Sequence, residues 1–176
     1  MSCRFTLRCL TSDMATAEVS ARHAYAAEQL TASHAGEILT LQRAAYLTEA
    51  AAHNDFDLPP LTQTLSELVD ELGSDDVIAL GMRDDTRLVG AVRLRRVGTA
   101  VELGRLTVAP DRQGQGIGTF LLAEAERAFL EAREMRLFTG EHSLANIRLY
   151  ERVGYNETER TPVGTYSLVH FTKPLR

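Results

Sequence analysis

The apolar residues of the chain recur with two periods, one typical of helices and one typical of strands. Between Ser33 and about Ala52 they recur every three or four positions, which predicts a helix with Ser33 as its N-cap. A short strand is expected just before it, at residues 27–31. The Pro59-Pro60 pair that follows lacks backbone N–H groups, so we expect it to prevent a quick restart of the helix.

A second helix signal leads into a series of strand signals. Thr64 and Glu67 have the spacing of a capping box, which predicts a short helix that ends at Leu72. Alternation of apolar and polar residues then predicts three strands joined by short turns, at residues 77–82, 88–96 and 101–108. Because the turns are short, these strands should pair as an antiparallel meander.

The third of these strands leads into a glycine-rich segment. Its alternation breaks at Gly104–Arg105, which indicates a β-bulge, and Pro110 ends the strand. The segment Gln113–Gly118 reads Gln-Gly-Gln-Gly-Ile-Gly, and a helix is predicted to start near Gly116. Glycines at a helix N-terminus expose several N–H groups at the positive end of the helix dipole. The segment therefore predicts a site for a phosphate or pyrophosphate group.

The remaining pattern completes an α/β (α+β) fold in a single domain. A strand at residues 136–139 follows the glycine-rich helix, so a β-α-β crossover should make it parallel to the strand before that helix. A helix at 144–153 and two strands at 155–159 and 167–173 come last. We assign residues 27–176 to this domain and residues 1–26 to an N-terminal extension of unknown role.

Composition narrows the classes of function. The 176 residues suffice for one domain with a core, and the formal net charge of −5 argues against a general affinity for nucleic acid. No apolar run is long enough to span a bilayer, so no membrane partner is expected. The only cysteines are Cys3 and Cys9, which predict neither a disulfide framework nor a metal site, and a reduced cytoplasm is the simplest setting.

The glycine spacing narrows the choice of phosphate ligand. A dinucleotide fingerprint would need glycine where Thr119 stands, and a P-loop would need a Gly-Lys-Ser/Thr sequence that is absent. The segment instead matches Q/R-x-x-G-x-G/A through Gln113, Gly116 and Gly118. With the strand before it and the amphipathic helix after it, the segment resembles the GNAT superfamily of N-acetyltransferases.

The resemblance implies a fold and a coenzyme site. In such proteins the strands on either side of the central helix splay apart, in a sheet with helices on both faces, and the loop wraps the pyrophosphate of acetyl-coenzyme A. The backbone of Leu106, Thr107 and Val108 would bind the pantetheine arm, and Arg112 would add charge near a phosphate. The resemblance assigns the pyrophosphate contacts to Gln113, Gly114, Gln115, Gly116, Ile117, Gly118 and Thr119.

The resemblance also implies catalytic residues. Tyr150 matches the general acid that protonates the departing thiolate, and Asn146, four residues earlier on the same helix face, matches a coenzyme contact. Glu102, at 113 − 102 = 11 positions before Gln113, matches a glutamate that some relatives use as a general base. Glu141 and His142 are the second and third candidates for this base.

The expected function is transfer of an acetyl group from acetyl-coenzyme A to a primary amine of a small molecule by direct attack. A protein or peptide amine is an alternative acceptor, and a non-catalytic domain that senses acetyl-coenzyme A is an alternative of another class. The acceptor pocket would form from residues 46–61 and the last hairpin near Tyr166. Glu49, Asp55 and Asp57 make this region acidic, which suits a cationic amine. A homodimer is expected by analogy alone.

Overall fold

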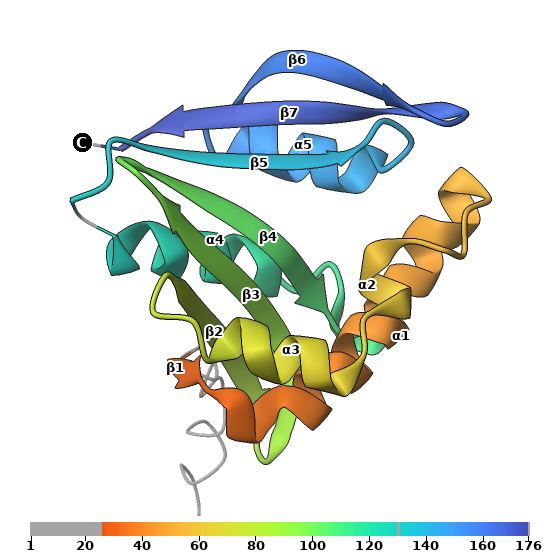
Figure 1. The fold of residues 1–176 in the computed structure, drawn as a ribbon. Helices are drawn as coiled ribbons and strands as arrows, with labels where there is room; N and C mark the ends of the chain where they lie inside the picture. The colour runs from red at the N-terminus through yellow and green to blue at the C-terminus, as the bar shows by residue number, and fades with distance from the viewer. Residues whose placement is uncertain (1–25, 130, 176) are drawn as a thin grey trace, which may run out of the picture.

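Seven strands form one mixed sheet in the computed structural model, which describes residues 26–129 and 131–175 (Figure 1). The strands pair in the order β1-β2-β3-β4-β5-β7-β6, and only the pairing of β4 with β5 is parallel. The predicted fold class is confirmed. The strands are β1 (Ala27–Leu30), β2 (Val77–Asp84), β3 (Arg87–Val97), β4 (Ala100–Val108), β5 (Glu134–Gly140), β6 (Asn156–Val163) and β7 (Tyr166–Pro174).

Helices cover both faces of the sheet (Figure 1). The helices are α1 (Ala35–His53), α2 (Pro59–Thr62), α3 (Leu65–Leu72), α4 (Ile117–Ala128) and α5 (Leu144–Arg152), with 3₁₀ turns η1 (Ala32–His34) and η2 (Pro110–Arg112). Arg93 of β3 bonds side chains of α1 and α3, whereas Gly90, on the opposite face of β3, lies against α4. Gly118 of α4 faces Leu149 of α5. Thus α1 and α3 lie on one face, and α4 and α5 lie on the other.

The sheet opens between β4 and β5. These two strands pair only where Ala100–Glu102 meets Glu134–Arg136, and beyond this point they diverge (Figure 1). We call the region between residues 103–108 and 137–140 the wedge. Within it β4 carries the predicted bulge: Arg105 has φ of +54°, and the register with β3 shifts by one residue there. A bulge bends and twists its strand, which directs the end of β4 away from β5.

Several local predictions are confirmed and three are wrong. The capping box of Thr64 and Glu67 forms, since the Thr64 N–H donates to the Glu67 carboxylate at 2.7 Å. Ser33 is not the N-cap of α1, because Thr31 caps the preceding turn η1 instead. Pro59 starts the short helix α2 instead of preventing one, since a proline fits the first helical turn, where its missing N–H would have no partner.

The last hairpin also differs from the prediction. The predicted strands at 155–159 and 167–173 leave the residues between them for the turn, but β6 continues to Val163 and the turn falls at Gly164, where φ is +60°. Pro162 fits in the strand because β6 is the edge of the sheet. On the outer side of an edge strand the backbone N–H and C=O groups have no partner strand, so a missing N–H there costs no hydrogen bond. All eight residues of β6 are exposed.

The part of the chain that the structure describes contains no helix long and apolar enough to cross a membrane. Cys3, Cys9 and the N-terminal extension up to residue 25 lie outside the described residues.

The packing of α4 on β3 depends on Gly90. A Cβ at Gly90 would lie 2.7 Å from Ile117 Cγ2 and 2.9 Å from Leu121 Cδ1. We expect Gly90→Ala to lower the free energy of unfolding by about 1–3 kcal/mol, because the buried side chains of α4 must shift. Urea unfolding measures this loss. Gly104→Ala is the matched control, since no atom lies within 4 Å of its added Cβ. Equal unfolding midpoints for the two variants would contradict this account.

Candidate active site

The N-terminus of α4 presents backbone N–H groups that have no acceptor within the helix. Gly114 and Gly116 have φ of +74° and +86°, a conformation that side-chain-bearing residues rarely adopt, and Gly116 is the N-cap. The first hydrogen bond within the helix runs from the Phe120 N–H to the Gly116 carbonyl. The N–H groups of Ile117, Gly118 and Thr119 therefore have no acceptor within the helix. No acidic side chain stands in the first turn of α4. The segment thus fits a phosphate group, as its sequence predicts.

The other predicted coenzyme contacts converge on this segment. A Cβ at Gly118 would lie 3.3 Å from Leu149 Cδ2 of α5 and 4.0 Å from Leu106 Cδ2 of β4, so these three elements meet there. Val108 also lies beside Gly118, and the buried Thr107 hydroxyl donates to the Ala91 carbonyl at 3.3 Å. The side chains of residues 106–108 therefore pack against neighbouring elements. The backbone of these same residues does not pair with β5.

The predicted phosphate contact Arg112 has a partner within the chain. Its guanidinium group forms an ion pair with Asp84 at the end of β2, and its Nε lies 3.8 Å from Asp111. Asp111 in turn forms a bidentate pair with Arg87, with both N–O distances at 2.8 Å. A phosphate contact by Arg112 would have to compete with Asp84.

Tyr150 lies at the wedge, on the α5 side. Its side chain is 5 % exposed and packs against Phe171 and Tyr155, with ring centroids 5.8 and 6.1 Å away. The pKa of the Tyr150 phenol is raised, first by burial and then by electrostatic interaction with Tyr46 and Glu49. Both of these residues belong to α1, on the other face of the sheet. They approach Tyr150 because no strand separates the two faces within the wedge.

The α1 side of the wedge carries acidic and aromatic groups. Tyr46 and Glu49 are three positions apart and share a helix face. Arg105, the bulge residue of β4, lies close enough to Tyr46 to oppose the rise of its phenol pKa, which burial causes. The Tyr166 hydroxyl donates to Asp55 at 3.5 Å, and the pKa of this phenol is raised by burial and by the Asp55 charge. The sequence placed this region at the acceptor, but it did not reveal that Tyr46 and Glu49 lie close enough to Tyr150 to raise the pKa of its phenol.

The candidate bases occupy different places. Glu102 is exposed and pairs across the sheet with Arg95 and with Arg136, at the point where β4 and β5 begin to diverge. Since cross-strand partners point to the same face, Glu102 lies on the α1–α3 face with Arg95. The Glu141 carboxylate instead accepts the Ser167 N–H at 2.7 Å and so holds the end of β5 to β7.

His142, the remaining candidate, is exposed and its ring centroid lies 5.2 Å from that of His53. Among residues 26–129 and 131–175, no group of three or more His, Cys, Asp or Glu side chains could hold a metal ion.

A search against models of protein families identifies this arrangement. The model of the Acetyltransferase (GNAT) family matches residues 38–155, which include α1, β4, the glycine-rich segment and Tyr150. The chain belongs to the GNAT family. The resemblance inferred from the segment Gln113–Gly118 is thereby confirmed.

Characterised GNAT proteins and solved GNAT structures agree with this placement. A spermidine N(1)-acetyltransferase of Thermoplasma acidophilum is 29 % identical to this chain over 93 residues. The match covers 52 % of this chain and 58 % of that protein. The structure of the PaiA N-acetyltransferase from Thermoplasma acidophilum in complex with coenzyme A has a TM-score of 0.71 at 19 % identity, covering 84 % of this chain and 98 % of that one.

A second structure is similar to the same degree. The ribosomal-protein-S18-alanine N-acetyltransferase of Escherichia coli has a TM-score of 0.71 at 16 % identity, covering 86 % of this chain and 94 % of that one. These two structural matches bear on the fold alone, because at such low identity site residues are not transferable.

Proposed function

We propose that this GNAT protein transfers the acetyl group of acetyl-coenzyme A to a primary amine of a small molecule by direct attack. The observation that supports this most is the position of Tyr150, a buried phenol with a raised pKa, at the wedge where the two faces of the sheet meet. The N-terminus of α4 lies on one face, and the acidic residues of α1 lie on the other. Coenzyme and acceptor would then approach Tyr150 from opposite faces.

The proposed step assigns a task to each group. The amine nitrogen bonds to the thioester carbonyl carbon as the carbon–sulfur bond breaks. A backbone N–H of β4 near Val108 would polarise the carbonyl oxygen. Tyr150 would give its proton to the departing sulfur and regain one from solvent. Glu102 would accept the proton that the amine loses and release it to water.

The acidic groups on the α1 side favour a cationic acceptor. Glu49 and Asp55 lie near the phenols of Tyr150 and Tyr166 respectively, so an ammonium group there would meet both carboxylates and aromatic faces. The similarity to a spermidine N(1)-acetyltransferase supports the same class of acceptor. We extend the proposal to a cytoplasmic location, which fractionation of cells would test.

The proposal is tested by thiol release from acetyl-coenzyme A across a panel of monoamines, diamines, amino acids and peptides, with thermal unfolding measured alongside. Coenzyme at about 100 times its dissociation constant should stabilise the fold by about 2.7 kcal/mol. We expect release with small amines, and fastest release with diamines. Release with peptides alone would support the protein-acceptor alternative. A thermal shift without release from any amine would support the sensor alternative, and no shift would contradict the coenzyme site.

Two matched variants separate the proposed roles of the carboxylates. Glu102→Gln should lower kcat about a hundredfold, because no base then accepts the amine proton. Glu49→Gln should raise KM for diamines more than for monoamines, since it removes a charge near the acceptor. Steady-state kinetics measure both effects. A hundredfold loss of kcat in Glu49→Gln and none in Glu102→Gln would exchange the two roles.

A further inference from the structure

His53, the last residue of α1, joins the two halves of the opened sheet. Helix α1 packs on β3 and β4. The neighbours of the His53 ring instead belong to the other half: Gly140 ends β5, His142 follows it, and Tyr166 begins β7. The ring is buried, with 7 % exposure for the residue, and its centroid lies 4.4 Å from that of Tyr166. The two halves thus meet both at the paired residues of β4 and β5 and at this ring.

The hydrogen bonds of His53 define its protonation state. Its Nδ1 lies 2.9 Å from the Glu49 carbonyl oxygen, which can only accept, so Nδ1 carries a proton and donates. Its Nε2 lies 3.4 Å from the backbone N–H of His142, which can only donate, so Nε2 carries no proton and accepts. Both contacts form at once only in the neutral imidazole with its proton on Nδ1.

The contact is also sterically tight. A Cβ built at Gly140 would lie 2.1 Å from His53 Nε2 and 2.4 Å from Cε1. The imidazole therefore occupies the place that any other residue at position 140 would need for its side chain. Glycine is required here by the close approach and not by backbone conformation, because Gly140 has no positive φ.

We infer that His53, in its neutral Nδ1–H form, is a positioning residue that spans the open end of the wedge and sets the separation between the acceptor side of α1 and Tyr150. The inference rests on the proposed function. Glu49 lies one helical turn before His53 and supplies the carbonyl that Nδ1 binds, so the ring fixes the turn that presents the Glu49 carboxylate. On the other side, the loop that donates to Nε2 leads directly into α5 and Tyr150.

Kinetics of three variants test this positioning role. Gly140→Ala should displace the ring and raise acceptor KM about ten- to hundredfold, because small misplacements of reacting groups are costly. The KM for acetyl-coenzyme A should stay unchanged, since the N-terminus of α4 is not involved. In the double variant His53→Ala/Gly140→Ala the clash is absent, so thermal stability should recover relative to Gly140→Ala while acceptor KM stays high. A double variant with wild-type acceptor KM would overturn the inference.

His170→Ala is the matched control. His170 lies on the same face of β7 as Tyr166, and it contacts Phe138 and Thr161, which belong to β5 and β6 and not to α1. Its removal should leave both KM values unchanged. A rise in acceptor KM equal to that of Gly140→Ala would show that the effect reports general loosening of β7, and this would overturn the inference.

A second measurement does not depend on activity. Nitrogen-15 NMR of histidine-labelled full-length protein at neutral pH should show His53 with the proton on Nδ1 and none on Nε2, and this signal should change in Gly140→Ala. If His53 carries its proton on Nε2, the contact with His142 is absent and the inference fails. If the Nδ1–H form is present but no amine releases thiol in the wild type, the proposed function fails while the His53 contact stands.

Discussion

Tyr150→Phe should lower kcat by about a hundred- to ten-thousandfold, because it removes the proposed proton donor to the leaving sulfur. The phenyl ring keeps its packing with Phe171 and Tyr155, so the fold and the binding of acetyl-coenzyme A should survive. Stopped-flow or steady-state thiol release measures the rate, and thermal shift with coenzyme measures binding. Of the activity changes predicted here, this is the largest.

The pH dependence of this variant follows from the raised pKa of Tyr150. A phenol whose pKa is higher in the folded state keeps its proton longer there than in the unfolded chain. Its contribution to stability is complete below about pH 10, the ordinary pKa of tyrosine, and decreases as the pH rises above that value. The wild type should therefore lose stability above pH 10 more steeply than Tyr150→Phe. In the pH–rate profile of the wild type, ionisation of Tyr150 should cause no loss of rate below pH 10.

Tyr155→Phe is the control for both effects. Tyr155 is also buried, and its hydroxyl donates to Met135 Sδ at 3.4 Å within the core. Burial raises the pKa of this phenol too, so the loss of stability above pH 10 should also be smaller in Tyr155→Phe. Its kcat should match the wild type. Unchanged kcat in Tyr150→Phe, or an equal decrease in both variants, would contradict the role of Tyr150 as general acid.

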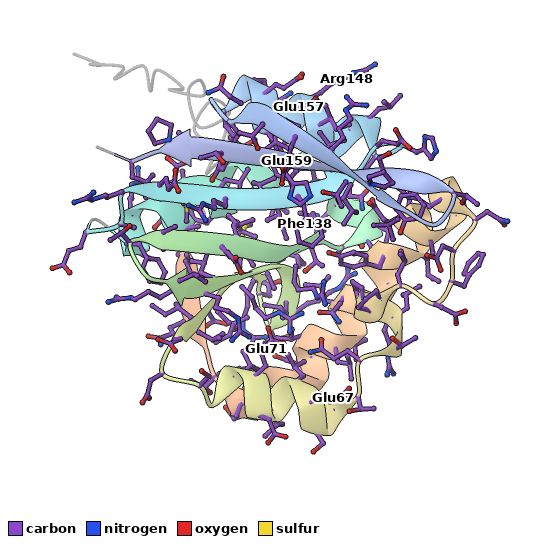
Figure 2. All side chains as sticks on the ribbon, turned by 45° about the horizontal axis from the view of Figure 1, so that its top comes forward. Glu67, Glu71, Phe138, Arg148, Glu157 and Glu159 are labelled. Carbon is purple, nitrogen blue, oxygen red and sulfur yellow. The ribbon has the colours of Figure 1, made fainter. Side chains whose placement is uncertain are left out.

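Glu71→Ala should have the largest effect on stability, about 3–5 kcal/mol, because it leaves the buried Arg93 charge without its carboxylate. Arg93 is 4 % exposed, and its Nη1 lies 2.6 Å from the Glu71 carboxylate on the side of α3 that faces the sheet (Figure 2). Burial lowers the pKa of Arg93 to about 10, so the group is still charged at neutral pH. After the substitution, the amide oxygens of Gln42 and Gln63 would still accept hydrogen bonds from Arg93, but neither carries a charge.

Urea unfolding of three variants tests the Arg93 account. Glu37→Ala removes one carboxylate from Arg83, an exposed pair that keeps a second partner in Glu28, and should cost about 1 kcal/mol or less. The double variant Glu71→Ala/Arg93→Met should recover most of the loss, because no buried charge remains. A loss in Glu71→Ala no larger than that in Glu37→Ala would contradict the account.

The parts of the site that the sequence predicted depend on local signals. The bulge at Arg105 and the glycine turn that starts α4 at Gly116 follow from a broken alternation and from glycine spacing, both of which act within a few residues. The capping box of Thr64 is local in the same way. Helix α2 differs from the prediction because a proline both interrupts a helix that precedes it and suits the first turn of a new one, and local sequence does not decide between the two.

The contacts across the wedge could not be predicted from the sequence. His53 and His142 are 89 positions apart, and no spacing rule connects them. Their contact depends on how far β5 has diverged from β4, which is a property of the whole sheet. The same holds for Glu49 and Tyr150. Each has the sequence pattern of an ordinary helical residue, and only the divergence of β4 from β5 brings the two faces of the sheet together at the wedge.

The bulge at Arg105 has a consequence for how this site can tolerate changes of length. Side chains along a strand alternate between two faces, so one inserted residue exchanges the faces of everything after it. Gly104 pairs with Arg93 and Thr107 pairs with Ala91, and the odd spacing between Gly104 and Thr107 puts Leu106 and Val108 on the α4 face, beneath Gly118. Deleting Arg105 alone would make the spacing between Gly104 and Thr107 equal to that between Arg93 and Ala91, so both apolar side chains would stay on the α4 face. The bulge itself would be lost, and with it the bend that directs the end of β4 away from β5. A one-residue deletion here would thus change the opening of the wedge and leave the packing of β4 against α4 in place.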